Sequence, residues 1–291
     1  MNLHSTCFIC NSTDIRPLAR YYEKHSLVKC HSCGLVFAHK IPTAEELNEH
    51  YKFYSYDKEA QLSEMTRMAY ARLLDEFEPF RKTNRILDVG CGRGWFLEEA
   101  QKRGWEVFGT EFSEAAIERC TEKGIQMRRG ALSSDQFERD FFDVITSIEV
   151  IEHIHTPLND LTHIHAFLRK GGLFYCTTPN FNSIMRYYLK EKYNVIEYPE
   201  HLTYYTKKTL TGAIERFPFK RHKFRSTGIS ITRIKQSLAQ EGSAPITHAN
   251  DENMREAISK KWYLDVAKRT LNFLFTLTNT GLTLKAYYIK K

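Results

Sequence analysis

Two groups of residues in this chain have the types and spacing that chemistry requires. The first is a loop in which an apolar run leads into an acidic residue and three alternate glycines, Ile86-Leu87-Asp88-Val89-Gly90-Cys91-Gly92-Arg93-Gly94. Glycine has no side chain to obstruct a ligand and tolerates positive φ, so this spacing predicts a tight turn whose backbone lies against a bound molecule. The second group is four cysteines near the N-terminus, whose thiolates suit a metal ion.

The glycine loop can be compared with three kinds of nucleotide-binding loop. A nicotinamide dinucleotide loop needs a glycine at position 95, where this chain has Trp95. A phosphate-binding loop needs Gly-Lys followed by Ser or Thr, which this segment lacks. The pattern that remains, Gly-x-Gly-x-Gly after an acidic strand end, closely resembles the loop of class I S-adenosylmethionine-dependent methyltransferases.

Further segments carry the same resemblance in the same order along the chain. Glu111 stands 21 residues after Gly90, where this family has an acidic residue at the tip of its second strand. The segment 130–132 resembles the third-strand loop that contacts adenine, and the segment 142–153 resembles the fourth strand. Residues 168–173 resemble the turn before the fifth strand. The plainer alternative is a tight turn in some other α/β fold, but such a turn would not account for an acidic residue at position 111.

The resemblance implies a set of cofactor-binding residues. Asp88 is expected to organise the ammonium group of the methionine part of the cofactor, and Phe112 to pack beside the adenine. The carboxylate of Glu111 is expected to accept hydrogen bonds from two ribose hydroxyls. The full expected set is Asp88, Gly90, Cys91, Gly92, Gly94, Glu111, Phe112, Ala131, Leu132, Ser147 and Glu149.

The four N-terminal cysteines predict a zinc ribbon. They form two Cys-x2-Cys pairs separated by nineteen residues, and they are Cys7, Cys10, Cys30 and Cys33. Four thiolates fill the tetrahedral positions of Zn2+, so the expected metal is structural, and His4 and His31 are not needed as ligands. Buried free thiols are the alternative, and a redox disulfide is disfavoured because there are two pairs.

Strand and helix patterns alternate from residue 85 onward. Strands are expected at 85–89, 106–110, 125–128, 143–148 and 173–177, with helices at 95–103, 113–123 and 158–168, the last closed by Gly171-Gly172. A helix at 207–217, a strand at 219–234, a polar insertion at 236–261, a helix at 262–278 and a strand at 282–289 follow. This order predicts an α/β fold with a Rossmann-like, seven-stranded, mostly parallel sheet, whose last strand is antiparallel, plus the small N-terminal ribbon.

Four regions divide the chain in this interpretation. They are the ribbon (1–40), a helical linker or lid (41–84), the cofactor-binding core (85–235), and a helical insertion with the final strand (236–291). In the second region Thr43 and Glu46 have the spacing of a capping box. Tyr51, Tyr54 and Tyr56 in the same region either close over the acceptor or pack within a helix.

The segment Pro199-Glu200-His201-Leu202-Thr203-Tyr204-Tyr205-Thr206, together with the ribbon and the core, resembles bacterial methyltransferases that modify sugars and other small-molecule precursors. In related sugar methyltransferases a Glu-His pair in this region lies at the active site. The resemblance therefore implies His201 as the base that deprotonates a hydroxyl acceptor, with Glu200 orienting it or binding the acceptor. His153 is a second candidate for the base. His163 and His165 are two positions apart on a helix, so they make a poor chelate and are expected to pack or face solvent.

Composition narrows the class of partner. The net charge is +7 but the basic residues are scattered, and the cluster at 220–225 is expected to be a solvated face. The leading expectation is O-methylation of a sugar, a glycoconjugate or another small molecule. An RNA methyltransferase that uses the ribbon to bind RNA, and a non-catalytic cofactor-binding module, are the alternatives. No leader peptide or membrane span is evident, which favours a cytoplasmic protein. The acceptor and the oligomeric state stay open.

Overall fold

The computed structural model describes residues 2–43, 45–46, 62–230, 234 and 262–291. The chain forms two compact units, each assembled from three stretches. The first unit comprises Met1–Ile41, Pro179–Leu210 and Phe224–Lys285. The second comprises Pro42–Thr178, Thr211–Lys223 and Ala286–Lys291.

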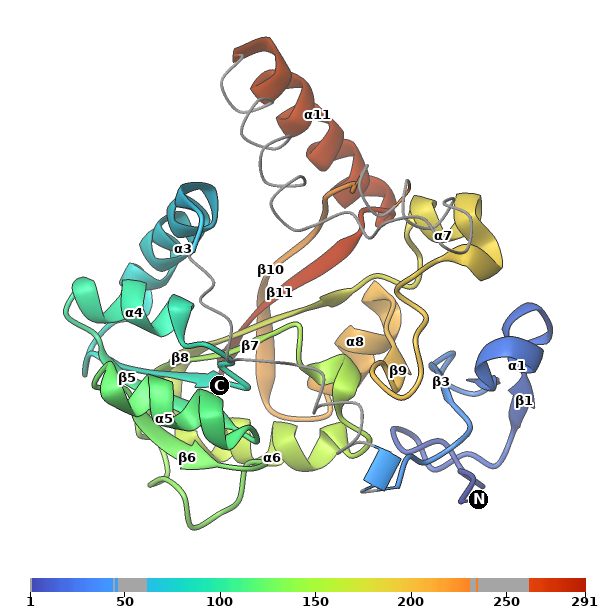
Figure 1. The fold of residues 1–291 in the computed structure, drawn as a ribbon, viewed down its shortest axis with the longest axis horizontal. Helices are drawn as coiled ribbons and strands as arrows, with labels where there is room; N and C mark the ends of the chain where they lie inside the picture. The colour runs from blue at the N-terminus through green and yellow to red at the C-terminus, as the bar shows by residue number, and fades with distance from the viewer. Residues whose placement is uncertain (1, 44, 47–61, 231–233, 235–261) are drawn as a thin grey trace. The chain divides into compact units, whose positions relative to one another are not determined.

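A seven-stranded sheet has the order β10-β11-β8-β7-β4-β5-β6, and most of its residues belong to the second unit (Figure 1). Its strands are β4 (Arg85–Val89), β5 (Glu106–Glu111), β6 (Gln126–Arg129), β7 (Phe142–Ile148), β8 (Leu168–Pro179), β10 (Phe219–Thr227) and β11 (Thr283–Lys290). The four pairs from β8 to β6 are parallel. At the other edge Lys291 N donates to Pro218 O and Leu282 N donates to Gly228 O, so β10 and β11 run antiparallel. The predicted mostly parallel sheet with an antiparallel last strand is confirmed.

Helices cover both faces of this sheet. They are α3 (Glu64–Phe77) with the 3-10 turn η1 (Glu78–Phe80), α4 (Trp95–Lys102), α5 (Glu114–Glu122), η2 (Ile151–His153) and α6 (Pro157–Phe167). The chain moves from β4 to β5 in one direction along the sheet and from β7 to β8 in the other, so right-handed crossovers place α4 and α5 opposite α6. Apolar side chains of α3, α4 and α5, among them Phe77 and Phe96, form the core with residues of β4 and β8.

Two helix starts have the capping residues that the sequence predicts. The Ser113 hydroxyl accepts from Ala116 N at the start of α5, at 3.4 Å. Thr43 and Glu46 exchange two bonds, Thr43 N to Glu46 Oε2 at 3.0 Å and Glu46 N to Thr43 Oγ1 at 3.2 Å, which is the predicted capping box.

The prediction that Gly171-Gly172 closes a helix is wrong. The helix α6 ends at Phe167 and β8 begins at once, so both glycines lie within the strand, where the register to β7 shifts between Phe142 and Val144. A Cβ on Gly172 would lie 2.9 Å from the carbonyl oxygens of Arg169 and Asp143. Glycine is therefore required here by the close approach of backbone at a bulge, not by a helix end.

Two expected elements are shorter than predicted. The helix α8 (Lys207–Ile214) ends before Phe217, and β10 ends at Thr227 because Gly228 takes a φ of +90°. The expected insertion at 236–261 and Tyr51, Tyr54 and Tyr56 lie outside the described residues.

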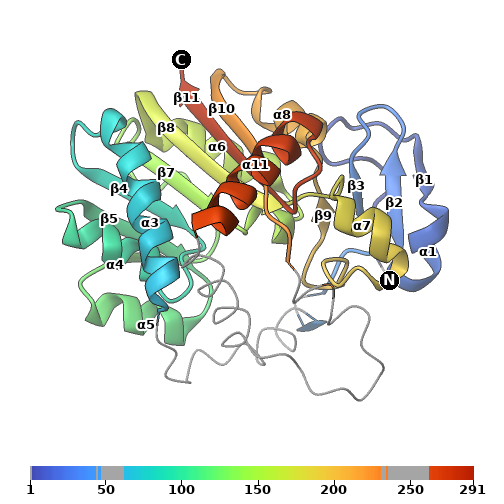
Figure 2. The same cartoon turned by 90° about the horizontal axis from the view of Figure 1, so that it is seen from above.

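The first unit contains a four-stranded sheet in the order β1-β2-β3-β9, whose strands are labelled in Figure 2. Its remaining elements are β1 (Ile15–Pro17), α1 (Ala19–His25), β2 (Leu27–Cys30), β3 (Val36–Ala38), α7 (Ile184–Leu189), η3 (Lys190–Lys192), β9 (Thr203–Tyr204) and α11 (Trp262–Thr278). The strands β3 and β9 are antiparallel, with Val36 opposite Tyr204 and Phe37 opposite Thr203. The core of this unit packs residues of β2 and β3 against residues 181–204. In the described part of the chain no helix has the length and apolar character to cross a membrane.

Candidate functional site

The candidate site lies where the order of the central sheet reverses. The strand β4 pairs in parallel with β5 on one side and with β7 on the other. In doubly wound sheets ligands bind beyond the carboxyl ends of the strands at this switch point. The glycine loop leaves β4 at this end of the sheet, and Glu111 and Ser147 lie at the matching ends of β5 and β7.

Close packing around the glycine loop leaves no room for side chains at two of its glycines. Gly90 has a φ of +67°, and a Cβ there would lie 2.7 Å from Val150 Cγ2. Gly94 has a φ of +73°, and its Cβ would lie 2.7 Å from Ile125 Cδ1 and 2.8 Å from Cys120 Sγ. Both positions therefore require glycine, and the loop presents bare backbone to a ligand.

Glu111 is fixed by backbone amides. Its Oε2 accepts from Gly92 N at 3.0 Å, and its Oε1 accepts from Phe112 N at 2.7 Å and Ser113 N at 3.2 Å. A carboxylate has about four lone-pair positions, so about one stays open for a ligand hydroxyl. A second ribose hydroxyl would have to replace the Gly92 amide, a constraint that the sequence did not reveal.

Asp88 is buried, with 4% of its surface exposed, and its Oδ1 accepts from Thr146 Oγ1 at 2.6 Å. Burial raises the pKa of Asp88 to about 7, and the negative charge of Glu111 adds to the rise while the hydroxyl of Thr146 opposes it. Tyr70 on α3 lies close by, and burial together with the charge of Asp88 raises its pKa to about 12. An anionic Asp88 is thus costly in the free protein and would be favoured by a cation.

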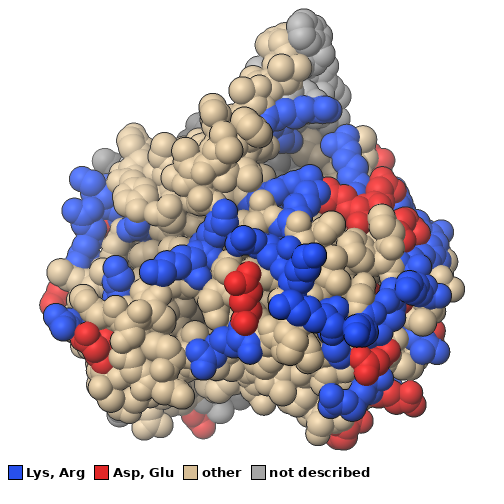
Figure 3. All heavy atoms as spheres, turned by 180° about the vertical axis from the view of Figure 1, so that it is seen from behind, with Lys and Arg blue, Asp and Glu red and all other residues tan. Residues whose placement is uncertain are grey.

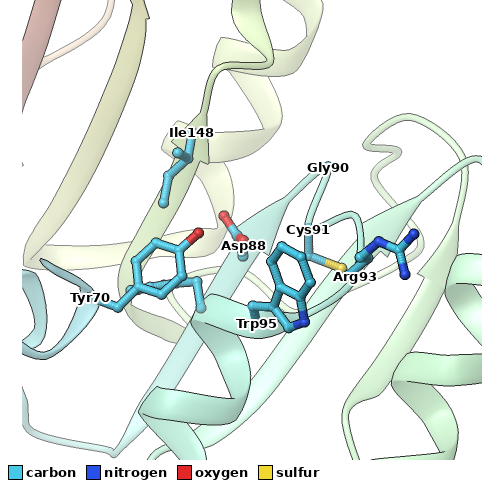
Figure 4. A pocket seen from close by; sticks show the side chains of 8 residues that line it. Tyr70, Asp88, Gly90, Cys91, Arg93, Trp95 and Ile148 are labelled. Atoms are coloured by element: carbon cyan, nitrogen blue, oxygen red, sulfur yellow. The ribbon is translucent and has the colours of Figure 1, made fainter. Parts of the chain in front are cut away.

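A small cavity of about 90 Å³ opens beside Asp88 (Figure 4). Its lining comprises Tyr70, Asp88, Gly90, Cys91, Arg93, Trp95, Phe96 and Ile148. This volume accommodates one end of a nucleoside ligand rather than the whole molecule. In Figure 4 the hydroxyl of Tyr70 points toward Asp88, and Trp95 stands on the other side of the cavity.

Sequence reasoning missed Tyr70, Arg93 and Trp95 as lining residues. Tyr70 comes from α3, in the region expected only as a helical linker or lid, where the sequence does not distinguish a tyrosine that lines a site from one that packs in a core. The guanidinium of Arg93 lies 5.7 Å from the ring centre of Trp95. The adjacency of both residues to Gly94 was the signal that could have identified them.

The other expected cofactor residues differ in how far their side chains are exposed to solvent. Phe112 is 69% exposed beside Glu111, and Ala131 is exposed on the loop after β6. Leu132 is only 2% exposed, so its side chain packs inward and only its backbone is left for a ligand. Asp160 on α6 accepts from the backbone N–H of Leu132, and burial raises the pKa of Asp160 to about 6 despite that bond.

At the end of β7, Ser147 is buried while Glu149 is exposed. Glu149 has a φ of +55°, unusual for a residue other than glycine, and its N–H donates to Thr177 O and Thr177 Oγ1, both at 3.1 Å. Strained backbone of this kind is frequent at ligand sites. The thiol of Cys91 packs beneath the loop, with its Sγ 3.9 Å from Met127 Sδ.

His201 lies in the first unit, just before β9. Its Nδ1 is 2.6 Å from Val195 O, which can only accept, so Nδ1 carries the proton and the neutral ring has Nε2 as its basic nitrogen. Glu200 precedes it and is half-buried. His153 belongs to the second unit, in η2, with its Nε2 4.0 Å from Oε1 of the buried Glu152.

The four N-terminal cysteines converge in the first unit. Their Sγ atoms all lie within 4.8 Å of one another. Cys7 Sγ is 3.6 Å from Cys33 Sγ, and Cys10 Sγ is 3.5 Å from Cys30 Sγ. Zinc–sulfur bonds of about 2.3 Å at tetrahedral angles separate neighbouring sulfurs by roughly 3.8 Å, so these residues fit a zinc site with four cysteine ligands.

Comparison with known proteins agrees with this geometry. The chain matches the family model described as "Methyltransferase domain" over residues 60–223. The ubiquinone biosynthesis O-methyltransferase of Ruegeria sp. (strain TM1040) is 31% identical over 124 residues, which is 38% of this chain and 50% of that protein. The enzyme of the same name from Roseobacter denitrificans is 35% identical over 111 residues, 36% of this chain and 44% of that protein. The chain thus spans about half the length of these relatives or less.

Solved structures share the fold. An S-adenosylmethionine-dependent methyltransferase from Archaeoglobus fulgidus is similar with a TM-score of 0.51 and 20% identity, covering 85% of this chain and 100% of that one. Geranyl diphosphate C-methyltransferase from Streptomyces coelicolor A3(2), solved with S-adenosyl-L-homocysteine, has a TM-score of 0.51 and 13% identity, covering 77% of each chain. The family match spans more than half of the sequence and includes the glycine loop, Glu111 and the parallel strands, so this chain belongs to the methyltransferase-domain family.

Proposed function

We propose that this protein transfers the methyl group of S-adenosylmethionine to a hydroxyl oxygen of a sugar, a glycoconjugate or another small molecule. Membership of the methyltransferase-domain family supports the methyl donor. The curated relatives are named O-methyltransferases, which supports oxygen as the acceptor atom. The observation that carries the proposal is Glu111, held by three backbone amides beside the glycine loop, where a carboxylate can accept a hydroxyl hydrogen bond.

The proposed donor site uses residues at the ends of β4 and β5. Asp88 holds the ammonium group and Glu111 a ribose hydroxyl, while the backbone of Gly90 to Gly94 lies along the ligand. Phe112 and Ala131 flank the adenine, with Asp160 fixing the backbone of Leu132. When bound, S-adenosylmethionine supplies a methyl group already activated by a sulfonium, so the protein contributes mainly by positioning.

In this proposal His201 takes the proton of the acceptor hydroxyl at Nε2. The bond from Nδ1 to Val195 O supports that role because it fixes the tautomer whose second nitrogen is basic. Glu200 binds or orients the acceptor, and His153 is the second candidate for the base.

We also propose that Cys7, Cys10, Cys30 and Cys33 hold a structural Zn2+. The ribbon then supports the acceptor side of the first unit, because Ala38 N, at the end of β3, donates to Leu202 O at 2.9 Å, next to His201. An internal structural role of this kind favours a small-molecule enzyme over an RNA-binding ribbon.

Isothermal titration with S-adenosylmethionine tests the donor half of the proposal. Glu111→Ala should weaken binding at least tenfold, since it removes the acceptor for the ribose and frees the loop amide. Glu106→Ala is the matched control, because Glu106 is an exposed glutamate at the opposite end of the same strand. Equal affinity of the two variants would show that Glu111 does not bind the cofactor.

A further inference from the structure

The first unit carries an unusual concentration of exposed apolar side chains. In the described part of the chain thirteen large apolar side chains are exposed, and ten of them belong to α7, α11 or Ile229. Scattered exposed apolar residues need no explanation, but a concentration of this kind marks an interaction surface. We call it the α7–α11 surface and define it by Ile184, Tyr187, Tyr188, Phe273, Leu274 and Leu277.

Among the described residues, the side chains that hold α11 come from one face of the helix. Asn272 Oδ1 accepts from Gly228 N at 2.8 Å, Thr276 Oγ1 donates to Ser226 O at 3.0 Å, and Phe275 is buried. Phe273 and Leu277, one turn apart on the opposite side of the helix, are 63% and 62% exposed. The apolar stripe of α11 therefore faces away from the strand end that holds the helix.

The helix α7 continues this surface. Its first residue, Ile184, donates its N–H to Thr280 O just beyond α11, at 2.9 Å. Met185 and Leu189 are buried, whereas Ile184, Tyr187 and Tyr188 are exposed at the i, i+3 and i+4 spacing of one helix face. Two amphipathic helices thus meet end to end within one unit.

The charged residues of α7, η3 and α11 are mostly basic. The segments 184–192 and 262–278 contain five lysines and arginines, at 186, 190, 192, 268 and 269, and two acidic residues, at 191 and 265. In Figure 3 the surface formed by α11 is mostly uncharged, with lysine and arginine side chains next to it. Apolar and aromatic residues bordered by basic ones are typical of helices that lie in the headgroup region of a membrane.

We propose that the α7–α11 surface binds an anionic lipid membrane, with both helices lying in the interface. The net positive charge argues against a second copy of this chain, because a symmetric contact would bring like charges together. The exposed tyrosines argue for lipid over an acidic protein, because their rings sit in the interface while their hydroxyls reach the headgroups.

Vesicle flotation with the full chain tests the proposal. The protein should float with phosphatidylcholine vesicles that contain about 30% phosphatidylglycerol and stay behind with phosphatidylcholine alone. Phe273→Glu combined with Leu277→Glu should reduce binding at least tenfold, because it removes two exposed apolar groups that the proposal places in the membrane interface. Lys190→Glu with Lys192→Glu should reduce it by about fivefold per residue and weaken its dependence on salt.

Met68→Glu is the matched control, because Met68 is 48% exposed on α3 of the other unit, and this variant should float like the parent. Binding of S-adenosylmethionine by each variant, measured by titration, shows that the fold persists. If the parent protein does not bind S-adenosylmethionine, the proposed function is wrong, and the flotation result still tests the membrane proposal separately. Absence of flotation, or flotation unaffected by the Phe273/Leu277 change, overturns the proposal. A concentration-dependent dimer that this change dissociates without any lipid binding would assign the surface to a second copy.

Discussion

Asp88 is a buried carboxyl whose charged form is unfavourable unless a cation lies beside it. A carboxyl whose pKa is about 7 in the fold, against an ordinary value of 3.8, favours its protonated form. The free protein therefore loses stability from this group as pH rises from about 4 through 7. In the proposed complex the ammonium group lies beside Asp88 and offsets this penalty, so we expect cofactor binding and proton release to be coupled.

Cofactor binding should release most of one proton at pH 6 and almost none at pH 8, because Asp88 is mostly protonated only at the lower pH. Titration calorimetry in two buffers of different ionisation enthalpy measures the number of protons. Asp88→Asn should abolish the release, weaken binding at least tenfold and raise the melting temperature of the free protein at pH 8. Proton release that persists in Asp88→Asn would assign the coupling to another group.

The proposed base can be tested without disturbing the donor site. His201→Ala should lower kcat by about 100-fold or more, the usual contribution of general-base catalysis, and leave the affinity for S-adenosylmethionine unchanged. Exposed His155 provides the control, and His155→Ala should keep the parent rate. If His153→Ala abolishes turnover while His201→Ala does not, the role belongs to His153.

At the scale of elements, the strand pair β3–β9 links the cysteine cluster to the segment that follows His201. Three antiparallel strands of the ribbon continue into β9, and the Tyr204 hydroxyl donates to His201 O at 2.9 Å. Loss of structure at the cysteines is therefore expected to displace His201 through this one sheet, while the proposed donor site keeps its structure.

Removal of the proposed zinc should separate catalysis from cofactor binding. Cys30→Ser, or treatment with a strong chelator, should release about one Zn2+ per chain by elemental analysis and lower the melting temperature. The affinity for S-adenosylmethionine should change less than threefold while kcat falls at least tenfold. Cys176→Ser, at a buried cysteine outside the cluster, should retain the metal. A protein purified without zinc that keeps full activity would contradict the structural role.

Elements with a strong local pattern could be predicted from sequence, and elements defined by distant partners could not. The strands β4, β5 and β7 and the cap at Ser113 followed from apolar runs and turn residues. Gly171-Gly172 was misassigned because a bulge and a helix end use the same residue for different reasons, and only the carbonyls of Arg169 and Asp143 distinguish them. Tyr70 was missed because its role depends on where α3 packs, which helical periodicity does not specify.

At the scale of the whole molecule, the parallel sheet was predictable because strand–helix alternation leaves few topologies. The composition of the two units was not, since each gathers three separated stretches. Nothing local in Thr203–Tyr204 indicates that it completes a sheet begun at residue 15. The loop after β4 and the end of β5, which carry Asp88 and Glu111, could be located from local pattern, and their roles toward the cofactor stay a prediction. The surroundings of His201 could not be located in this way, because they depend on pairing between distant segments.

The pairing of Val36 with Tyr204 also constrains how the protein is made. The four cysteines are synthesised before β9. One edge of β3 therefore has no partner strand until Tyr204 has been synthesised, 168 residues after Val36. By then β4 through β8 have already been translated. The N-terminal sheet must therefore mature late, and until it does the nascent chain carries an open strand edge that invites incorrect pairing.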